Sequence, residues 1–230
     1  MESWRRNGVS SLILEIPGTG DCPASPADPK SPDRLYTSLF EWVSHQQNID
    51  QKRVAIWAFS TGGYYAIRVA HTHHSKLAAV VSQGGGCHFM FDPRWLSEVN
   101  HLEYPFDLAD TLAHKFGYGS DVARFKREAM AKYSLLEDGT LDGKDCARLL
   151  LVNGVRDEVF PIDDCYLALE HGAPKEVRFV RGEKHMGEPD AFFLILPWLY
   201  ERFGIVANPV EQLRMLPFKP RFHIEGEEEG

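Results

Sequence analysis

The chain has 230 residues, 43% of them hydrophobic and 25% charged, and its formal net charge is −8. A chain of this length and composition can form one globular domain with its own core, and its acidic balance argues against nucleic acid or an anionic membrane as the main partner. Apolar runs fall short of the ~20 residues that span a bilayer, and the run at 12–16 is too short and too charged for a signal peptide, so we expect a cytoplasmic protein.

The first predicted elements are a strand and a helix. Residues 11–16 have the apolar content of a strand, and the glycine- and proline-rich loop 17–23 follows it, at the edge of the sheet where α/β proteins place their active sites. Residues 31–33 (Ser-Pro-Asp) are typical of a helix N-terminus. The apolar spacing after them predicts an amphipathic helix whose inward residues are Leu35, Leu39, Trp42 and Val43.

The next pattern is a strand, a sharp turn and a second helix. Residues 54–57 are apolar, residues 58–63 read Ala-Phe-Ser-Thr-Gly-Gly, and residues 64–70 have helical spacing. Small residues around a serine let the backbone turn so sharply that the hydroxyl is exposed at the helix N-terminus, as in a nucleophile elbow. Ser60 is therefore the candidate nucleophile, and the backbone N–H of Thr61 is the candidate oxyanion donor. Because Ala58 replaces the first glycine of G-x-S-x-G, an ordinary serine N-cap is the alternative.

A short predicted strand at 77–81 is followed by a long segment without strand periodicity. This segment contains helical patterns near 108–116 and 122–133. We interpret residues 87–138 as a helical insertion that forms a lid, whose aromatic side chains would suit an aromatic or polyketide substrate. The alternative is that these rings form the core of the insertion itself. The candidate substrate-binding residues are Phe89, Trp95 and Tyr104.

Two further predicted strands each end in a loop that carries a chemically useful side chain. Residues 147–152 run into a polar loop that contains Asp157, and residues 176–180 run into a glycine-bounded loop that contains His185. Serine, acid and histidine in this order, each just after a strand, are typical of the α/β-hydrolases, in which the histidine takes the serine proton and the acid fixes its tautomer. The sequence therefore predicts a catalytic triad of Ser60, Asp157 and His185.

Other polar groups are expected to have structural roles. Asp163 and Asp164 precede a helical pattern and would complement the dipole of that helix, so their substitution should affect stability more than turnover. The histidines at 71, 73 and 74 point to different faces of one helix and do not indicate a metal site. We expect no metal and no organic cofactor. Reduced thiols are expected from the four cysteines, which lack C-x-x-C spacing: Cys22, Cys87, Cys146 and Cys165.

Several longer segments are more specific than these patterns. They are LILEIPGTGDCPASPADPKSPDRLY, AFSTGGYYAIRVAHTH, GCHFMFDPRWLSEVNHLEYPFD and LLLVNGVRDEVFPIDDC, with LEHGAPKEVRF and KHMG. From about Gly8 to Gly204 the chain closely resembles the fungal yellowish-green pigment hydrolases, which are α/β-hydrolases related to the polyketide transferase and FrsA-like group. The resemblance implies carbon-carbon bond hydrolysis that releases acetoacetate from a heptaketide naphthopyrone and gives tetrahydroxynaphthalene for melanin. It also places the family's triad on Ser60, Asp157 and His185.

The resemblance implies a fold as well. We expect an α/β-hydrolase core over residues 1–206 with the lid at 87–138, and a tail at 207–230 that is disordered at its end. Relatives carry a helical N-terminal region and further strands before the segment matching 12–17, including one whose loop donates the second oxyanion N–H. We therefore expect a truncated or degenerate copy that is poorly stable and weakly active alone. An esterase, thioesterase or acyltransferase of secondary metabolism is one alternative, an inactive remnant is another, and a homodimer is left open.

Overall fold

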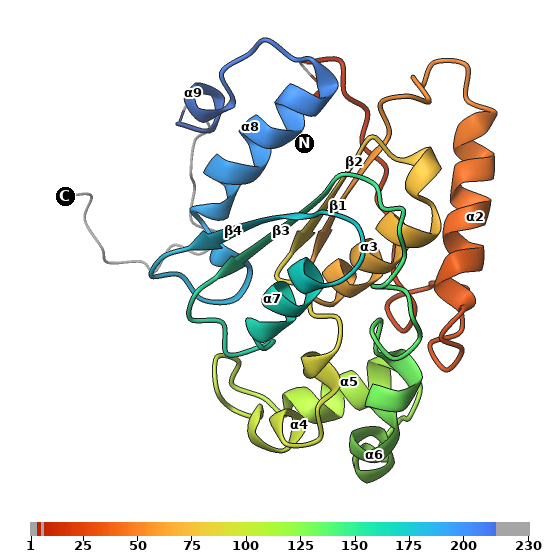
Figure 1. Ribbon diagram of the computed structural model, residues 1–230, viewed down its shortest axis with the longest axis vertical. Helices are drawn as coiled ribbons and strands as arrows, with labels where there is room; N and C mark the ends of the chain where they lie inside the picture. Colours follow the sequence, from red (N-terminus) through yellow and green to blue (C-terminus); the bar gives the residue numbers. More distant parts are fainter. Residues whose placement is uncertain (1–3, 6, 215–230) are drawn as a thin grey trace, which may run out of the picture.

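The computed structural model describes residues 4–5 and 7–214, and its centre is a parallel β-sheet (Figure 1). The four strands of this sheet follow the order of the chain, with each strand parallel to the next. Parallel neighbours require crossover connections, and here these connections are helical. The strands are β1 (Ala55–Phe59), β2 (Ala79–Gln83), β3 (Leu149–Gly154) and β4 (Glu176–Val180).

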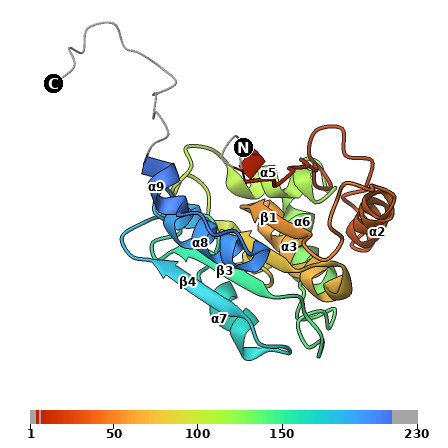
Figure 2. The same ribbon diagram turned by 90° about the horizontal axis from the view of Figure 1, so that it is seen from above.

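The central strands β2 and β3 are buried on both faces, because each begins with a continuous apolar run (Ala-Val-Val and Leu-Leu-Leu-Val) and not with an alternation of apolar and polar residues. Successive side chains of a strand point to opposite faces. Leu149 and Leu151 therefore belong to the core that contains α3, whereas Leu150 and Val152 belong to the core that contains α8. Figure 2 shows the sheet between α8 on one side and α7 on the other.

Eight α-helices are described with their bounds. Helix α3 is buried along nearly its whole length because it lies between the sheet, α2 and the segment that follows β2. In the part of the chain that the structure describes, every helix is too short or too polar to cross a membrane. The helices are α2 (Ser31–Ser44), α3 (Thr61–Thr72), α4 (Trp95–Glu98), α5 (Leu108–Lys115), α6 (Val122–Tyr133), α7 (Asp163–Glu170), α8 (Ala191–Phe203) and α9 (Pro209–Arg214).

Residues 87–138, called the insertion below, connect β2 to β3 through α4, α5 and α6 and lie together below the sheet in Figure 1. An aromatic cluster forms much of their core, in which the rings of Phe91 and Phe116 are 5.1 Å apart. The insertion is fixed to α3 by Tyr64, whose hydroxyl donates to Tyr133 O at 2.8 Å. For Phe91, the interpretation as core of the insertion is therefore the right one.

Buried Arg68 joins three segments. Its guanidinium donates to both carboxylate oxygens of Asp33 in α2, at 2.8 and 2.6 Å, and to Asp138 at the end of the insertion, at 2.6 Å. A guanidinium with matched carboxylates is well suited to a buried position. The ion pairs connect α2, α3 and the insertion, so the helix that follows Ser60 has a fixed position.

The predicted strand at 11–16 is wrong. These residues form no ladder with any described strand, and Leu12 and Ile13 are 58% and 76% exposed. A strand exists only when a neighbour pairs with it, and the outer edge of β1 has no partner among residues 4–5 and 7–214. Phe59 at the end of β1 is accordingly 47% exposed.

Two smaller expectations also differ from the structure. In α2 the buried apolar stripe is Tyr36, Phe40 and Val43, so the predicted inward position of Trp42 is wrong, and its side chain is 51% exposed. Positions i, i+4 and i+7 of a helix share one face, and residue 42 lies off that face. The expected tail from 207 begins with α9, and its predicted disordered end lies outside the described residues.

Candidate active site

Ser60 lies at the turn between β1 and α3. Its φ of 54° and ψ of −125° are rare for a residue with a side chain and characteristic of a nucleophile elbow. Hydrogen bonds from Ser60 N to Gln83 O and from Gly63 N to Ser60 O, both 2.8 Å, fix the turn. Ala58 lies opposite Gly62, where even an added Cβ would be at an ordinary 3.5 Å. This space explains why the turn tolerates alanine in place of the usual first glycine.

The Ser60 hydroxyl contacts a histidine and does not cap the helix. Ser60 Oγ is 2.8 Å from His185 Nε2, and its side chain makes no capping bond to α3. His185 Nδ1 is 2.9 Å from Asp157 Oδ2, and the two side chains are 1% and 0% exposed. The structure thus joins the three predicted residues by two hydrogen bonds. A neutral histidine protonated on Nδ1 donates to the acid and accepts from the serine.

The Asp157 carboxylate is held by groups from its own loop and from β3. Oδ1 accepts from Val159 N at 2.7 Å and Phe160 N at 3.0 Å, and Oδ2 accepts from Asn153 Nδ2 at 2.6 Å. Asn153 Oδ1 also accepts from Met186 N at 3.0 Å, so this amide connects the acid to the histidine loop. The sequence reasoning missed Asn153, although a polar residue at the end of a buried strand was a usable signal.

Two glycines let the histidine loop approach the sheet. Gly84, just after β2, has φ +71°, and a Cβ there would lie 2.6 Å from Met186 Cγ and 3.0 Å from His185 Cε1. A Cβ on Gly154, at the end of β3, would overlap the Lys184 carbonyl oxygen. Glycine is the residue that permits a positive φ and such close contact. Larger residues at 84 or 154 would therefore move His185 away from Ser60.

The insertion contributes Glu103 to the same loops. Its two carboxylate oxygens accept from His185 N at 3.1 and 3.2 Å, and one of them also accepts from Glu158 N at 3.3 Å. Next to it, the predicted substrate-binding residue Tyr104 lies edge-on to the His185 ring, with centroids 6.1 Å apart, and Phe160 lies edge-on at 5.4 Å. No local sequence signal indicates Glu103, because only the fold brings it to the histidine loop.

The predicted oxyanion donor Thr61 is the first residue of α3 and is buried. N–H groups of the first helical turn have no acceptor within the helix, and among the described residues no backbone carbonyl accepts from Thr61 N. This N–H is therefore free to bind an oxyanion beside Ser60. Lys115 of the insertion, which the sequence reasoning missed, places its Nζ 3.4 Å from Thr61 Oγ1.

The other two predicted substrate-binding residues lie elsewhere in the insertion. Phe89 is half-buried with its ring 4.8 Å from that of His88. Trp95 packs against the main core, and its indole N–H has no hydrogen-bond partner in the described part of the chain. Over residues 4–5 and 7–214, neither side chain makes a hydrogen bond or ring contact with Ser60 or His185. Their role in substrate binding stays a prediction.

Asp163 and Asp164 lie in the first turn of α7, as predicted, and Asp164 has a further structural role. Its buried carboxylate makes no cap to α7 and instead accepts from His88 N at 2.8 Å, Phe89 N at 2.8 Å and Met90 N at 2.9 Å. Burial raises the pKa of the Asp164 carboxyl, although these hydrogen bonds act in the opposite direction. Asp164 thus fixes the first residues of the insertion, whereas Asp163 is exposed.

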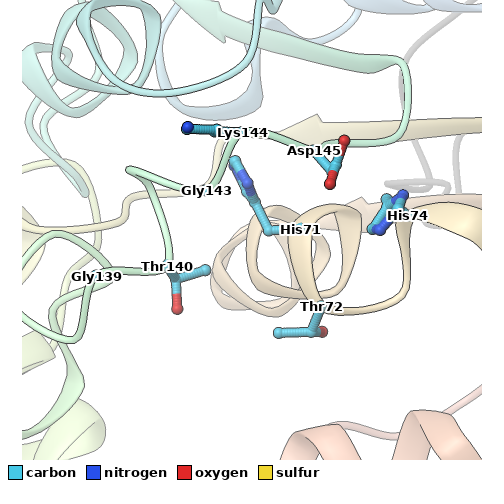
Figure 3. Close-up of a pocket in the computed structure, with 8 residues that line it drawn as sticks. All are labelled: His71, Thr72, His74, Gly139, Thr140, Gly143, Lys144 and Asp145. Atoms are coloured by element: carbon cyan, nitrogen blue, oxygen red, sulfur yellow. The ribbon is translucent and has the colours of Figure 1, made fainter.

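A separate cavity of about 300 Å³ lies at the other end of α3 (Figure 3). The nitrogens of His71 have no well-formed hydrogen bond in the described chain, and burial lowers the pKa of His71 to about 4, so the ring is neutral at pH 7. Ser60 precedes the other end of the 12-residue helix, roughly 16 Å away along its axis. The lining residues are His71, Thr72, His74, Gly139, Thr140, Gly143, Lys144 and Asp145.

The parallel sheet with helices on both faces, and a serine, histidine and acid at the carboxyl ends of its strands, define the α/β-hydrolase fold. The family model for "Esterase FrsA-like" matches residues 4–185. The chain therefore belongs to the FrsA-like esterase family, whose members are α/β-hydrolases. This confirms the predicted fold class.

Solved structures agree with this fold. AbyA5 is 22% identical with a TM-score of 0.71, covering 93% of this chain and 60% of AbyA5. The 2,6-dihydroxy-pseudo-oxynicotine hydrolase is 18% identical with a TM-score of 0.64, and the match covers 85% of this chain and 53% of that hydrolase. The α/β-hydrolase GrgF from Penicillium sp. sh18 is 14% identical with a TM-score of 0.56, and the match covers 89% of this chain and 81% of GrgF. The chain thus spans about 60% of the length of AbyA5. Comparison with curated proteins gave no match.

Proposed function

We propose that the chain is a serine hydrolase that breaks a carbon-carbon bond in a polyketide, shortening a heptaketide naphthopyrone to tetrahydroxynaphthalene in pigment biosynthesis. The observation that carries the proposal is the position of His185, 2.8 Å from Ser60 Oγ and 2.9 Å from Asp157. Membership of the FrsA-like esterase family supports acyl chemistry, and the resemblance to the pigment hydrolases supports the polyketide substrate.

In the first half of the reaction, His185 Nε2 takes the proton of Ser60 Oγ, and the oxygen attacks a ketone carbonyl carbon. The oxyanion that forms accepts a hydrogen bond from Thr61 N–H at the positive end of α3. Asp157 holds the imidazole in the tautomer that accepts at Nε2 and stabilises the imidazolium that forms. The roles of His185 and Asp157 follow from two hydrogen-bond contacts, His185 Nε2 to Ser60 Oγ and His185 Nδ1 to Asp157 Oδ2.

In the second half, the tetrahedral intermediate collapses and the bond to the α-carbon breaks. The electron pair leaves as an enolate or a conjugated carbanion, which the His185 imidazolium protonates on carbon. A simple carbanion would be too poor a leaving group, so this route requires a poly-β-ketone. Water, deprotonated by His185, then hydrolyses the acyl-enzyme and regenerates Ser60.

Aromatic side chains of the insertion support a flat substrate. Tyr104 lies beside His185 and stacks on Phe106, with ring centroids 5.2 Å apart and planes at 10°. Phe106 is 41% exposed, so part of this aromatic surface is open. Stacked rings favour contact with another aromatic system. We therefore propose that Tyr104 contributes to binding the naphthopyrone rings.

The test is a substrate panel on the purified chain: a naphthopyrone, an aryl ester and an acyl thioester of similar size. We expect naphthopyrone cleavage with release of acetoacetate, detected by mass spectrometry, at a higher kcat/KM than for either ester. A preference for the esters would replace the proposal with an esterase or thioesterase, an alternative that the family's esterase description favours. A product acylated on an added alcohol would indicate an acyltransferase. A folded chain inactive on all three would be a remnant.

Glu103 provides a test of how the histidine loop is held. Glu103→Ala removes the acceptor of His185 N and Glu158 N, so we expect kcat to fall about 10-fold to 100-fold through misplacement of the imidazole, with a smaller change in KM. Steady-state kinetics measure both constants. Glu98→Ala, an exposed residue of the same insertion, is the matched control and should keep wild-type kinetics. Unchanged kcat in Glu103→Ala would show that the loop keeps its position without this carboxylate.

A further inference from the structure

Lys115 places a positive charge beside Thr61, the residue that follows the nucleophile. It is the last residue of α5, it is half-buried, and its Nζ lies 3.4 Å from Thr61 Oγ1. Across residues 4–5 and 7–214, no carboxylate lies within 4.0 Å of this ammonium group. Burial lowers the pKa of Lys115, and no neighbouring charge opposes that shift. A partly desolvated charge of this kind is unfavourable unless an anion compensates it.

The position of Lys115 makes a compensating anion more favourable still. Thr61 begins α3, where the unpaired N–H groups give a positive end. A lysine in the last turn of a helix normally complements the dipole of that helix from solvent, but this ammonium is directed at the first turn of a different helix. The Lys115 ammonium group and the N-terminus of α3 therefore meet beside Ser60, and both attract negatively charged oxygen.

The backbone of Lys115 is fixed from a second side. Gly18 has φ +80°, and a Cβ there would overlap the Lys115 carbonyl oxygen, so loop 17–23 packs directly on the end of α5. The loop, α5 and the elbow thus meet at one point. A lysine held by this packing occupies a defined place and does not act as a freely moving surface charge.

We propose that Lys115 is a further catalytic residue, whose ammonium group donates a hydrogen bond to the enolate oxygen of the leaving group. This inference rests on the proposed function. When Ser60 Oγ has bonded to the carbonyl carbon of a β-diketone, the bond to the α-carbon breaks and its electron pair passes to the second carbonyl, giving an enolate oxygen. His185 then returns its proton to the α-carbon, and the second product is a neutral ketone. Lys115 keeps its proton throughout.

The geometry of a β-diketone suits this arrangement. Its two carbonyl carbons are separated by a single carbon, so one oxygen can accept from Thr61 N–H while the other faces the ammonium that contacts Thr61 Oγ1. An ester offers no second oxygen of this kind, because its leaving oxygen is bonded to the attacked carbon itself and is protonated by His185. Lys115 should therefore matter for diketones and not for esters.

The test compares two substrates that form the same acetyl-enzyme: 1-phenylbutane-1,3-dione, attacked at its acetyl group, and phenyl acetate. Single-turnover acetylation of Ser60 is followed by intact mass in the full chain. Lys115→Met should slow acetylation by the diketone about 100-fold, the usual effect of losing one preorganised donor, and leave that by phenyl acetate near the wild-type rate. Lys115→Arg, which keeps the charge, should recover part of the loss. Lys52→Met, at an exposed site, is the control.

The outcomes separate this inference from the proposed function. Equal losses on both substrates in Lys115→Met would assign Lys115 a structural role, and an unchanged diketone rate would show that it does not contact the leaving group. Either result overturns the inference alone. A wild-type chain that reacts with phenyl acetate but not with the diketone overturns the inference together with the proposed carbon-carbon bond hydrolysis. A neutral fluorophosphonate that fails to label Ser60 in the wild-type chain would instead overturn the proposed function.

Discussion

Ser60→Ala is expected to lower kcat about 10⁴-fold or more, and His185→Ala by a similar factor, because the nucleophile and its base act as a unit. A fluorophosphonate probe should label the wild-type chain on Ser60 and fail to label Ser60→Ala. Asp157→Ala should cost less, since Asn153 and the surrounding packing still orient the imidazole in part. Rate measurements with the preferred substrate of the panel, and mass spectrometry of the labelled protein, check both parts.

Circular dichroism and unfolding curves of each variant provide the control for folding. Labelling that persists in Ser60→Ala would place the nucleophile elsewhere. Small and roughly equal rate losses in all three variants would show that the hydrogen-bonded group Ser60, His185 and Asp157 is structural. The assignment of Asp157 as the acid of the triad is tested separately. If Asp163→Asn abolished turnover while Asp157→Asn stayed active, the catalytic role of Asp157 and the structural role of Asp163 would have to be exchanged.

Asp164→Ala is expected to lower the free energy of unfolding by about 3 kcal/mol or more. The substitution leaves the backbone N–H groups of His88, Phe89 and Met90 without their acceptor, and each unsatisfied buried donor costs on the order of 1 to 3 kcal/mol. Urea unfolding followed by tryptophan fluorescence measures the change. Breaking a buried hydrogen-bond network is one of the mechanisms that produce large losses of stability from a single substitution.

The neighbouring residue supplies a matched control. Asp163 is exposed, so Asp163→Ala should unfold close to the wild-type midpoint. The turnover of Asp164→Ala per folded molecule should stay within the wild-type range under stabilising conditions, because Asp164 makes no contact with Ser60 or His185 among the described residues. Equal unfolding midpoints for the two variants would show that water or a backbone shift satisfies the freed N–H groups.

The sequence predicted the parts of the site that have local signals. The elbow around Ser60 is encoded by small residues between a strand and a helix, and the loops of Asp157 and His185 follow the segments that form β3 and β4. Short-range patterns determine such elements. The same holds for α6, whose predicted bounds 122–133 agree with Val122–Tyr133 in the structure.

The rest depends on contacts between distant segments. Residues 11–16 have the composition of a strand but pair with none of the described strands. A strand forms only beside a neighbouring strand, and composition alone does not supply that neighbour. Glu103 and Lys115 reach the site only through the path of the insertion, and Asp164 turns its carboxylate to a loop about 75 residues away in sequence. Sequence periodicity contains no information on these approaches. The position of Asp164 at the start of α7 was therefore predictable, but its contacts with residues 88–90 were not.

The hydrogen bonds of Glu103 also bear on how the molecule would admit a ligand. Glu103 belongs to the insertion and His185 to the core, so any opening that moves residue 103 outward removes the acceptor of the His185 N–H. A ligand would then enter one state of the molecule, the open state, and His185 would be aligned with Ser60 in another, the closed state. Turnover would scale with the population of the closed state, and a ligand that binds the closed state more tightly would raise that population and complete the site around itself.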